Sequence, residues 1–308
     1  MRKLTICLLG DVVFRLGDGP PLPLAPGKTS ALLAYMAVEA AHPHSRQTLA
    51  TLLWPERSDT EALGALRFAL SNLRAGLHGR DATGRVLLID RSRVQLNPQA
   101  EVWVDAVAFR ERAAALRERA AALREQGAAC ETVPSVETLR VALALYRGPF
   151  LQGFNFGDSL DFESWALRTR EQLERARMHL LHMLGTGQEA AGEHAQAAEA
   201  YRAVLESQPW DEDAQRGLMR ALAANGNYSA ALVQYMACRQ ALGDLGIEPG
   251  RATNALYQRL KREQAAPDTV DEPAAIPFVA RERELARLAI ALERALAEQG
   301  QIVLITGE

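Results

Sequence analysis

Leucine residues recur at three- and four-residue intervals across residues 60–77, which is the spacing of one face of an α-helix. The stripe consists of Leu63, Leu66, Leu70, Leu73 and Leu77. An apolar stripe of this kind packs on a core, so the rest of the helix surface faces away from it. The pattern therefore predicts an amphipathic helix whose outer surface carries arginine, serine and asparagine.

A shorter helix precedes this segment and a hairpin follows it. Residues 45–54 begin with a serine, which is a favoured N-cap, and they end before a proline. Two β-rich runs, at residues 85–90 and 93–97, read as strands joined by a tight turn. The order helix, turn, helix, hairpin is typical of a winged helix, which presents its second helix to the DNA major groove. We therefore interpret residues 60–77 as a recognition helix.

The expected DNA contacts fall into two groups. Side chains on the outer helix surface would read base edges, and these are Arg67, Ser71, Asn72 and Arg74. In the hairpin, Arg91 and Arg93 would bind phosphate and set affinity without reading sequence, and Arg85 is a further phosphate candidate. Phe68 would either press against a thymine methyl group or pack on a neighbouring element.

The segment before these helices reads as a small sheet followed by a helix. Residues 4–9 and 12–16 are β-rich around a Gly-Asp turn, and residues 28–40 carry a helical pattern. The Gly-Lys-Thr string at the start of that helix resembles the end of a phosphate-binding loop. The first glycine of such a loop would fall at Leu22, so we interpret the string as a helix start. Two histidines around a proline, at residues 42–44, have no third ligand nearby and are interpreted as a turn.

Several strings in residues 1–98 resemble the OmpR/PhoB-type winged helix of SARP-type bacterial regulators. The most specific are LATLLWP at residues 49–55 and LRFALSNLRAGL at residues 66–77. The resemblance implies that the second helix enters the major groove and that the hairpin contacts the DNA backbone or the minor groove. It also implies a loop near RNA polymerase, formed by Glu56, Arg57, Ser58 and Asp59.

The rest of the chain is almost wholly helical in pattern. Helical patterns cover residues 106–126, 136–146 and 159–185. Farther along, residues of the same type recur 34 positions apart, and the pairs are Gly192 and Gly226, Ala197 and Ala231, and Tyr201 and Tyr235. This is the period of tetratricopeptide repeats. Such repeats stack into curved surfaces that bind proteins or peptides.

Two further strings, ALYRGPFL at residues 144–151 and LGDLGIEP at residues 242–249, resemble the bacterial transcriptional activation domain of SARP-type regulators. The resemblance covers residues 101–263. It implies that this region supports self-association on DNA and contacts with the transcription machinery. The predicted fold is an α+β winged helix-turn-helix domain at residues 1–98, followed by an all-α helical repeat domain of the tetratricopeptide type at residues 101–263.

The end of the chain reads as a linker and the beginning of another domain. Residues 264–277 carry proline, alanine and acidic residues, which is typical of a linker. Residues 278–308 resemble the start of an AAA/STAND-type signal-transducing ATPase. The chain stops before the glycine-lysine pair that cradles phosphate. We therefore expect no cofactor here, and ATP binding only in a longer chain with the complete loop.

Charge is divided unevenly along the chain, whose formal net charge is −3. Residues 1–98 hold 12 lysines and arginines against 8 acidic residues, a balance of +4, and residues 99–308 hold the remaining 23 against 30, a balance of −7. Excess positive charge thus lies with the proposed DNA-binding module. The short N-terminal apolar run predicts neither a signal peptide nor a membrane span, so we expect a cytoplasmic protein without membrane contact. Cys7, Cys130 and Cys238 are widely spaced, which indicates neither a disulfide framework nor a zinc site.

Two classes of function agree with these patterns. The first is a sequence-specific DNA-binding transcriptional regulator. The resemblance to SARP-type regulators implies that it is an activator that self-associates on tandem direct repeats of double-stranded DNA and recruits RNA polymerase. The alternative is a protein-interaction scaffold of a signal-transducing ATPase, in which the winged helix mediates protein contacts. An enzyme is not expected, because the sequence lacks H-E-x-x-H, G-x-S-x-G and a complete phosphate-binding loop. The arginine-bearing surface favours the regulator, since a protein-binding winged helix would not need it.

Overall fold

The structure is a computed structural model that describes residues 3–24, 27–78, 86–125, 134–154 and 156–265. Its contacts divide the chain into a compact unit of residues 1–261 and a second unit of residues 262–308. All elements given below begin in the first unit. The predicted ATPase segment lies outside the described residues, as does most of the predicted linker.

A small sheet near the N-terminus joins segments that are far apart in the sequence. Its strands are β1 (Leu4–Cys7), β2 (Val13–Leu16) and β6 (Val102–Val104), in the order β2-β1-β6. The β1–β2 pair is antiparallel, as the two β-rich runs predict, whereas β6 pairs parallel with β1. The predicted N-terminal module of residues 1–98 therefore omitted one strand of its own sheet.

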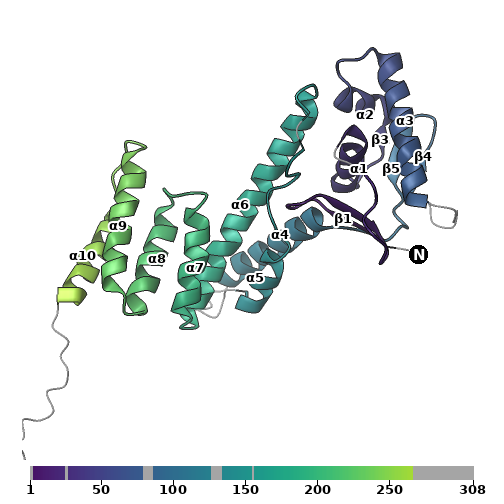
Figure 1. The fold of residues 1–308 in the computed structure, drawn as a ribbon. Helices are drawn as coiled ribbons and strands as arrows, with labels where there is room; N and C mark the ends of the chain where they lie inside the picture. Colours follow the sequence, from purple (N-terminus) through teal and green to yellow (C-terminus); the bar gives the residue numbers. More distant parts are fainter. Residues whose placement is uncertain (1–2, 25–26, 79–85, 126–133, 155, 266–308) are drawn as a thin grey trace, which may run out of the picture. The chain divides into compact units, whose positions relative to one another are not determined.

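Three helices and a second sheet complete the N-terminal part (Figure 1). The helices are α1 (Lys28–Val38), α2 (Arg46–Leu53) and α3 (Asp59–His78). The strands are β3 (His44–Ser45), β4 (Leu87–Ile89) and β5 (Arg93–Leu96), in the antiparallel order β3-β5-β4. The helix start predicted at the Gly-Lys-Thr string is confirmed. The turn predicted for both histidines is wrong for His44, which pairs with Val94 of β5 as a strand residue.

The leucine stripe of α3 is buried, as its spacing predicts. Leu66, Leu70, Leu73 and Leu77 are each at most 3% exposed, and Leu63 is half-buried. Fully burying a leucine side chain contributes roughly 1.5–3 kcal/mol relative to leaving it in water. The stripe therefore determines which surface of α3 remains available to a partner.

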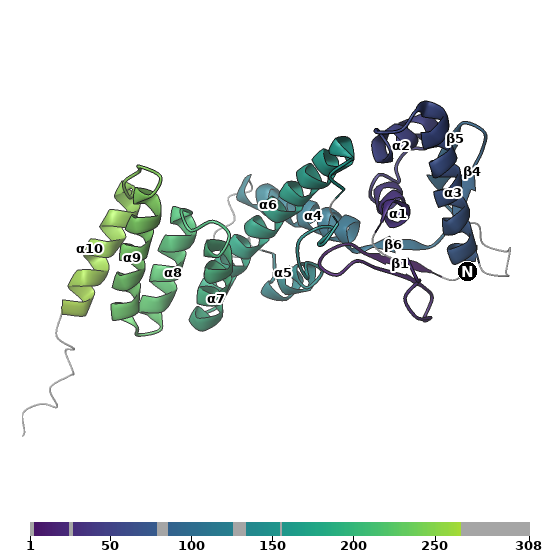
Figure 2. The same ribbon diagram turned by 45° about the horizontal axis from the view of Figure 1, so that its top comes forward.

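Helices make up the rest of the described chain (Figures 1 and 2). They are α4 (Asp105–Glu125), α5 (Val136–Leu143), α6 (Leu160–Ala190), α7 (His194–Leu205), α8 (Glu212–Ala224), α9 (Tyr228–Gly243) and α10 (Arg251–Ala265). In both views α7, α8 and α9 lie side by side, in chain order. Two predicted helices have different ends, because α5 stops three residues before residue 146 and α6 continues five residues past residue 185.

The residues of the 34-residue repeat occupy matching places in this stack. Gly192 and Gly226 lie in the turns before α7 and α9, with φ angles of +76° and +80°, a region that favours glycine. Ala197 and Ala231 are fully buried in those two helices. The same turn geometry and the same small buried residue thus recur in α7 and α9.

Tyr201 of α7 packs against Gly185, the residue at which the sequence predicted α6 to end. Its ring lies against Gly185 of α6 and Gly217 of α8, where an added Cβ would come within 2.7 Å and 2.4 Å of ring atoms. Gly185 is therefore a packing residue inside a helix and not a helix terminator. Tyr235, its counterpart in α9, is half-buried and stacks on Tyr257 of α10 with 4.1 Å between ring centroids.

The N-terminal part shares one hydrophobic core with α4, α5 and α6, and a second core lies among α6–α10. Trp165 of α6 lies edge-on to the ring of Tyr35 in α1 and donates from Nε1 to Glu39 Oε1 at 2.9 Å. Asp105, the first residue of α4, is 1% exposed and accepts a 2.7 Å hydrogen bond from the backbone amide of Leu8. Buried contacts therefore connect both parts of the unit, with no linker between them.

None of the helices described by the structure is long and apolar enough to cross a membrane. The described residues also contain no group of three histidine, cysteine or acidic side chains placed to hold a metal ion. Cys7 is half-buried and Cys238 is buried, and both are free thiols. Cys130 lies outside the described residues.

Candidate nucleic-acid interface

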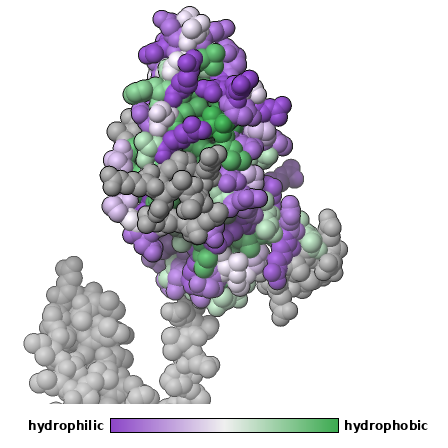
Figure 3. All heavy atoms as spheres, turned by 90° about the vertical axis from the view of Figure 1, so that its right-hand side faces the viewer, coloured by the Kyte–Doolittle hydropathy of each residue, from purple (hydrophilic) through white to green (hydrophobic). Residues whose placement is uncertain are grey.

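The outer surface of α3 carries the predicted base-reading side chains. The side chains of Arg67, Ser71, Asn72 and Arg74 are all exposed. Phe68 is 69% exposed, so its ring is largely free of packing. Figure 3 views the molecule from the side where α3 lies in Figure 1, and it shows hydrophobic atoms bordered by hydrophilic ones on this face. Such a surface offers both hydrogen-bond donors and an apolar contact.

The turn before α3 is closed by Ser58 and Glu61. The Ser58 backbone amide and hydroxyl both donate to Glu61 Oε2, at 3.1 Å and 2.7 Å, as in one half of a capping box. The bond from the hydroxyl, and then that from the amide, lowers the pKa of the Glu61 carboxyl. Of the predicted polymerase loop, Glu56, Arg57 and Ser58 lie in this turn, and Asp59 is the first residue of α3.

Lys28, the first residue of α1, connects this turn to the segment before α6. Its Nζ lies 3.2 Å from Glu56 Oε1 and 2.7 Å from Asp158 Oδ2. The hydrogen bond from Lys28 lowers the pKa of the Asp158 carboxyl. Because both carboxylates are well exposed, each pair contributes only about 0–1 kcal/mol to stability.

Asp90 organises the turn of the β4–β5 hairpin. Its Oδ1 accepts hydrogen bonds from the backbone amides of Ser92 and Arg93, at 2.7 Å and 2.6 Å. These two bonds, that from Ser92 first, lower the pKa of the Asp90 carboxyl. The hairpin predicted around residues 91 and 92 is confirmed, and both Arg91 and Arg93 are exposed. Arg85 lies outside the described residues.

A hollow of about 530 Å³ lies where α2, α3 and this hairpin turn meet. Its lining brings together Arg67 and Arg91, which the sequence predicts to contact DNA, and adds Arg46. Arg46 donates from its backbone amide to the Ser92 carbonyl oxygen at 2.9 Å and from Nη1 to the Asp90 carbonyl oxygen at 3.3 Å. Three arginines, from α2, α3 and the hairpin turn, therefore line one hollow. Guanidinium groups bind phosphate oxygens and guanine edges in a bidentate manner.

Sequence reasoning missed Arg46, although a signal was present. Arg46 directly follows Ser45, whose hydroxyl caps α2, so it stands in the first turn of a helix, where anions bind favourably. Other predicted residues are not among those lining the hollow. Ser71, Asn72 and Arg74 lie one to two turns farther along α3 than Arg67.

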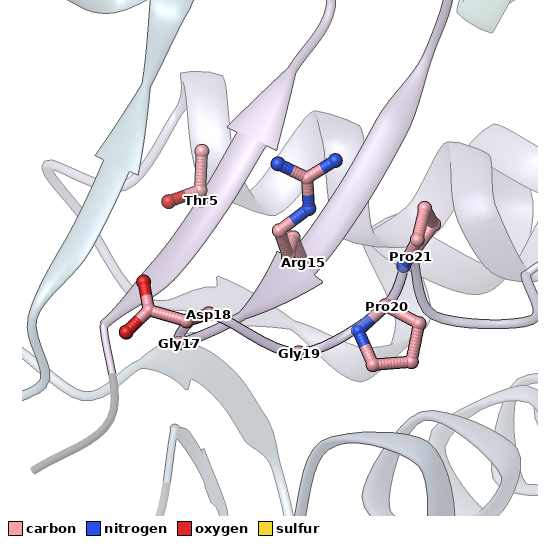
Figure 4. A pocket seen from close by; sticks show the side chains of 7 residues that line it. All are labelled: Thr5, Arg15, Gly17, Asp18, Gly19, Pro20 and Pro21. Carbon is pink, nitrogen blue, oxygen red and sulfur yellow. The ribbon is translucent and has the colours of Figure 1, made fainter.

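A second hollow, of about 450 Å³, lies on the N-terminal sheet (Figure 4). It is lined by Thr5, Arg15, Gly17, Asp18, Gly19, Pro20 and Pro21. Figure 4 shows Arg15 projecting from β2 beside Thr5 of β1, with Asp18 in the turn that follows β2. One cation and one anion among the lining residues balance each other. This hollow therefore lacks the excess positive charge of the first one.

Comparison with known proteins identifies the helical part. A model of the bacterial transcriptional activator domain matches residues 104–261, which is just over half of the chain. The chain belongs to this family. It is 29% identical over 283 residues to the transcriptional regulatory protein EmbR of Mycobacterium tuberculosis, which covers 85% of this chain and 64% of EmbR. The chain therefore spans 64% of the length of that relative.

Two further matches extend beyond the bacterial transcriptional activator domain itself. The regulatory protein AfsR of Streptomyces coelicolor is 29% identical over 250 residues, which cover 81% of this chain and 23% of AfsR. A solved structure of Mycobacterium tuberculosis EmbR in complex with a low affinity phosphopeptide superimposes with a TM-score of 0.64 and 25% identity, covering 98% of this chain and 73% of that one. The resemblance to SARP-type regulators is thereby confirmed, and the ATPase resemblance of residues 278–308 stays a prediction.

Proposed function

We propose that this protein is a sequence-specific DNA-binding transcriptional regulator in which α1–α3 and β3–β5 act as a winged helix. The observation that carries the proposal is the convergence of Arg46, Arg67 and Arg91 beside the exposed surface of α3. A winged helix places its second helix in the major groove, and its hairpin then approaches the adjacent backbone. Relatives that carry the names of transcriptional regulatory proteins support the same function.

Base reading falls to the outer surface of α3 in this proposal. Arg67 and Arg74 offer bidentate donors to guanine, and each such pair is worth roughly 1–3 kcal/mol of discrimination against a wrong base. Ser71 and Asn72 lie between them and reach adenine or guanine edges. Phe68, with its ring 69% exposed, supplies an apolar contact for a thymine methyl group.

Phosphate binding falls to the arginines around the hairpin. Arg91 lies at the hairpin turn and Arg46 is hydrogen-bonded to that turn, while Arg93 is exposed at the start of β5. Contacts to phosphate fix the position of a protein on the duplex and carry no sequence information directly. These three arginines therefore set affinity and its salt dependence.

The helical part supplies the other partners in this proposal. We assign residues 101–263 to self-association on tandem direct repeats, together with contacts to the transcription machinery. The turn at residues 56–59 is the proposed RNA polymerase contact, because its side chains are exposed at the end of α2. Within this turn, Glu56 pairs with Lys28 of α1.

Selection of random duplex DNA by the purified chain tests the proposal. We expect one motif to be enriched, in two copies in the same orientation, and hydroxyl-radical footprints to show two protected half-sites. The Arg67→Ala variant should enrich a degenerate form of the motif, whereas Arg15→Ala, which removes an exposed arginine of β2, should enrich the parent motif. Arg15 is the matched control because β2 has no part in the proposed contacts.

Failure to enrich any motif would contradict the proposal. Weak, sequence-blind binding at low salt would then favour the scaffold function, in which the helical repeat binds a protein. A single footprinted half-site, or an inverted pair, would overturn only the tandem arrangement.

A further inference from the structure

A hollow of about 450 Å³ in the helical part is lined by three arginines. They are Arg147, in the turn after α5, and Arg170 and Arg177 of α6. The other lining residues are Tyr146, Gly148, Pro149, Glu174 and Ser207. Small-molecule sites in proteins occupy about 300–1,000 Å³. The hollow therefore has room for a compact ligand.

The one carboxylate in the lining, Glu174, is already engaged. Its Oε2 accepts from the Tyr146 hydroxyl at 2.6 Å, and its Oε1 accepts from Arg177 Nη1 at 2.9 Å and from Ser207 Oγ at 3.2 Å. The Arg177 guanidinium also lies over the Tyr146 ring, 5.3 Å from its centroid. Glu174 therefore serves to hold Arg177, Tyr146 and Ser207 in place on the wall of the hollow.

Arg147 is held in place by the buried carboxylate of Asp105. Its Nη2 donates to Asp105 Oδ2 at 2.8 Å, and Asp105 is 1% exposed while the Arg147 side chain is 52% exposed. Asp105 also accepts from backbone amides, which include those of Leu8 and Leu9. The carboxylate is thus satisfied on the buried side, and the guanidinium, which also bonds the Cys7 side chain, stays half exposed at the hollow.

Arg170 is the cation without a balancing carboxylate. Its Nε donates to the Phe150 carbonyl oxygen at 3.1 Å, which orients the guanidinium. Within the residues that the structure describes, Arg170 forms no ion pair. Three guanidinium groups thus face two carboxylates, Glu174 and Asp105, and a net charge of +1 remains at the hollow.

We propose that this hollow binds the phosphate group of a small phosphorylated molecule or of free phosphate, with Arg170 as the central ligand and Arg147 and Arg177 beside it. Arginine is suited to phosphate because its planar fork donates two parallel hydrogen bonds. The three guanidinium groups together offer more hydrogen-bond donors than the two oxygens of a carboxylate ligand can accept. A phosphate group suits them better, because it presents three strong acceptor oxygens. The site is independent of the proposed DNA contacts, since it shares no residue with them.

Isothermal titration calorimetry at physiological ionic strength tests the proposal, with inorganic phosphate and glucose 6-phosphate as probes. We expect saturable binding of at least one probe with one site per chain. Tighter binding of inorganic phosphate would indicate free phosphate as the source, and tighter binding of glucose 6-phosphate an organic phosphate. Arg170→Gln should weaken binding by roughly 10-fold or more, because hydrogen bonds to charged groups are worth about 1.5–3 kcal/mol each.

Three further variants keep the test independent of folding and of DNA binding. Arg170→Lys keeps the charge and loses the fork, so we expect an affinity between those of the parent and Arg170→Gln. Arg168→Gln removes an exposed arginine two residues away on the same helix and should leave binding unchanged. A chain with Arg67→Ala and Arg91→Ala should bind as the parent does, which excludes the first hollow as the site.

Three results would overturn the proposal, and the first two concern the hollow itself. One is the absence of saturable binding of either probe up to millimolar concentration. The other is equal affinity in the parent and in Arg170→Gln, with circular dichroism showing that both are folded. Loss of binding in the Arg67→Ala, Arg91→Ala chain would also overturn it, because the probe would then occupy the proposed DNA surface.

Discussion

Arg46 Nη1 lies 3.3 Å from the carbonyl oxygen of Asp90 and donates to it, which links the first turn of α2 to the turn of the β4–β5 hairpin. The backbone of Arg46 makes a second link, to the Ser92 carbonyl oxygen. Arg46 and the hairpin turn are 44 residues apart in the chain, and these hydrogen bonds hold Arg46 beside the turn that carries Arg91. This relationship gives the proposed phosphate-binding surface a fixed geometry before DNA arrives.

Replacement of Arg46 by alanine should lower affinity for every duplex by the same factor. Arg46 is expected to bind phosphate, and removal of one phosphate contact reduces the slope of log K against log salt by about 0.9. Fluorescence anisotropy across a salt series, with a selected and a scrambled duplex, measures both quantities. A loss confined to the selected duplex would mean that Arg46 reads sequence instead.

The Asp90 carboxylate should stabilise the hairpin turn only while it is ionised. Its pKa in the folded chain lies below the ordinary value of 3.8, chiefly because the Ser92 and Arg93 amides donate to it. The stabilisation is therefore complete above that ordinary value and is lost as pH falls through the lower folded pKa. Amide chemical shifts of Ser92 and Arg93, followed during acid titration, report the transition.

A matched variant distinguishes the negative charge of Asp90 from the hydrogen-bond acceptor that its oxygen provides. Asp90→Asn keeps an acceptor for the turn and should remove the titration of both amides. If the parent amides titrate at or above 3.8, the hydrogen bonds described for Asp90 do not hold the turn in solution.

Sequence patterns predicted helix α3 well because its signal is local. The leucine stripe of α3 is periodic within 20 residues, and periodicity of this kind does not depend on distant partners. The hairpin could also be predicted from the sequence, since two β-rich runs flank a short turn. By contrast, β6 has only three residues and pairs with β1, a strand about 100 residues away, so no local pattern identifies it.

The differences in the helical part have a similar cause. Gly185 reads as a helix end in sequence, because glycine is common there. Its actual role is to admit the Tyr201 ring from a neighbouring helix, and that requirement appears only in the packed structure. For Arg46 the sequence did hold a signal, its place in the first turn of a capped helix, but its contact with the hairpin turn appears only in the packed structure.

Replacement of Gly217 by alanine should destabilise the unit by about 1–3 kcal/mol, because the new Cβ would lie 2.4 Å from the Tyr201 ring and the core would be overpacked. The denaturant midpoint in urea measures this loss. Gly76→Ala in α3 is the matched control, because its Cβ meets nothing within 4 Å and the better helix propensity should give about 0.5–1 kcal/mol of added stability. Equal stability of Gly217→Ala and the parent would show that Tyr201 can move aside.

Replacement of Asp105 by alanine should cost roughly 1–3 kcal/mol for each of the two buried amides, those of Leu8 and Leu9, that lose their acceptor. Asp158→Ala removes a well-exposed carboxylate from Lys28 and should cost no more than about 1 kcal/mol. Thermal unfolding of the two variants compares the stability lost with a buried carboxylate and with an exposed one. Similar losses in both variants would contradict the role given to Asp105.

The central claim is that α3 reads DNA sequence through Arg67 while the hairpin binds phosphate through Arg91. The most direct measurement is the ratio of affinities for the selected and the scrambled duplex, at one salt concentration, in Arg67→Ala and Arg91→Ala. Arg67→Ala should reduce this ratio by roughly 5- to 150-fold, which corresponds to 1–3 kcal/mol of lost discrimination. Arg91→Ala should leave the ratio unchanged and lower both affinities. An unchanged ratio in Arg67→Ala, in a chain that is folded and selects a motif, would contradict the claim.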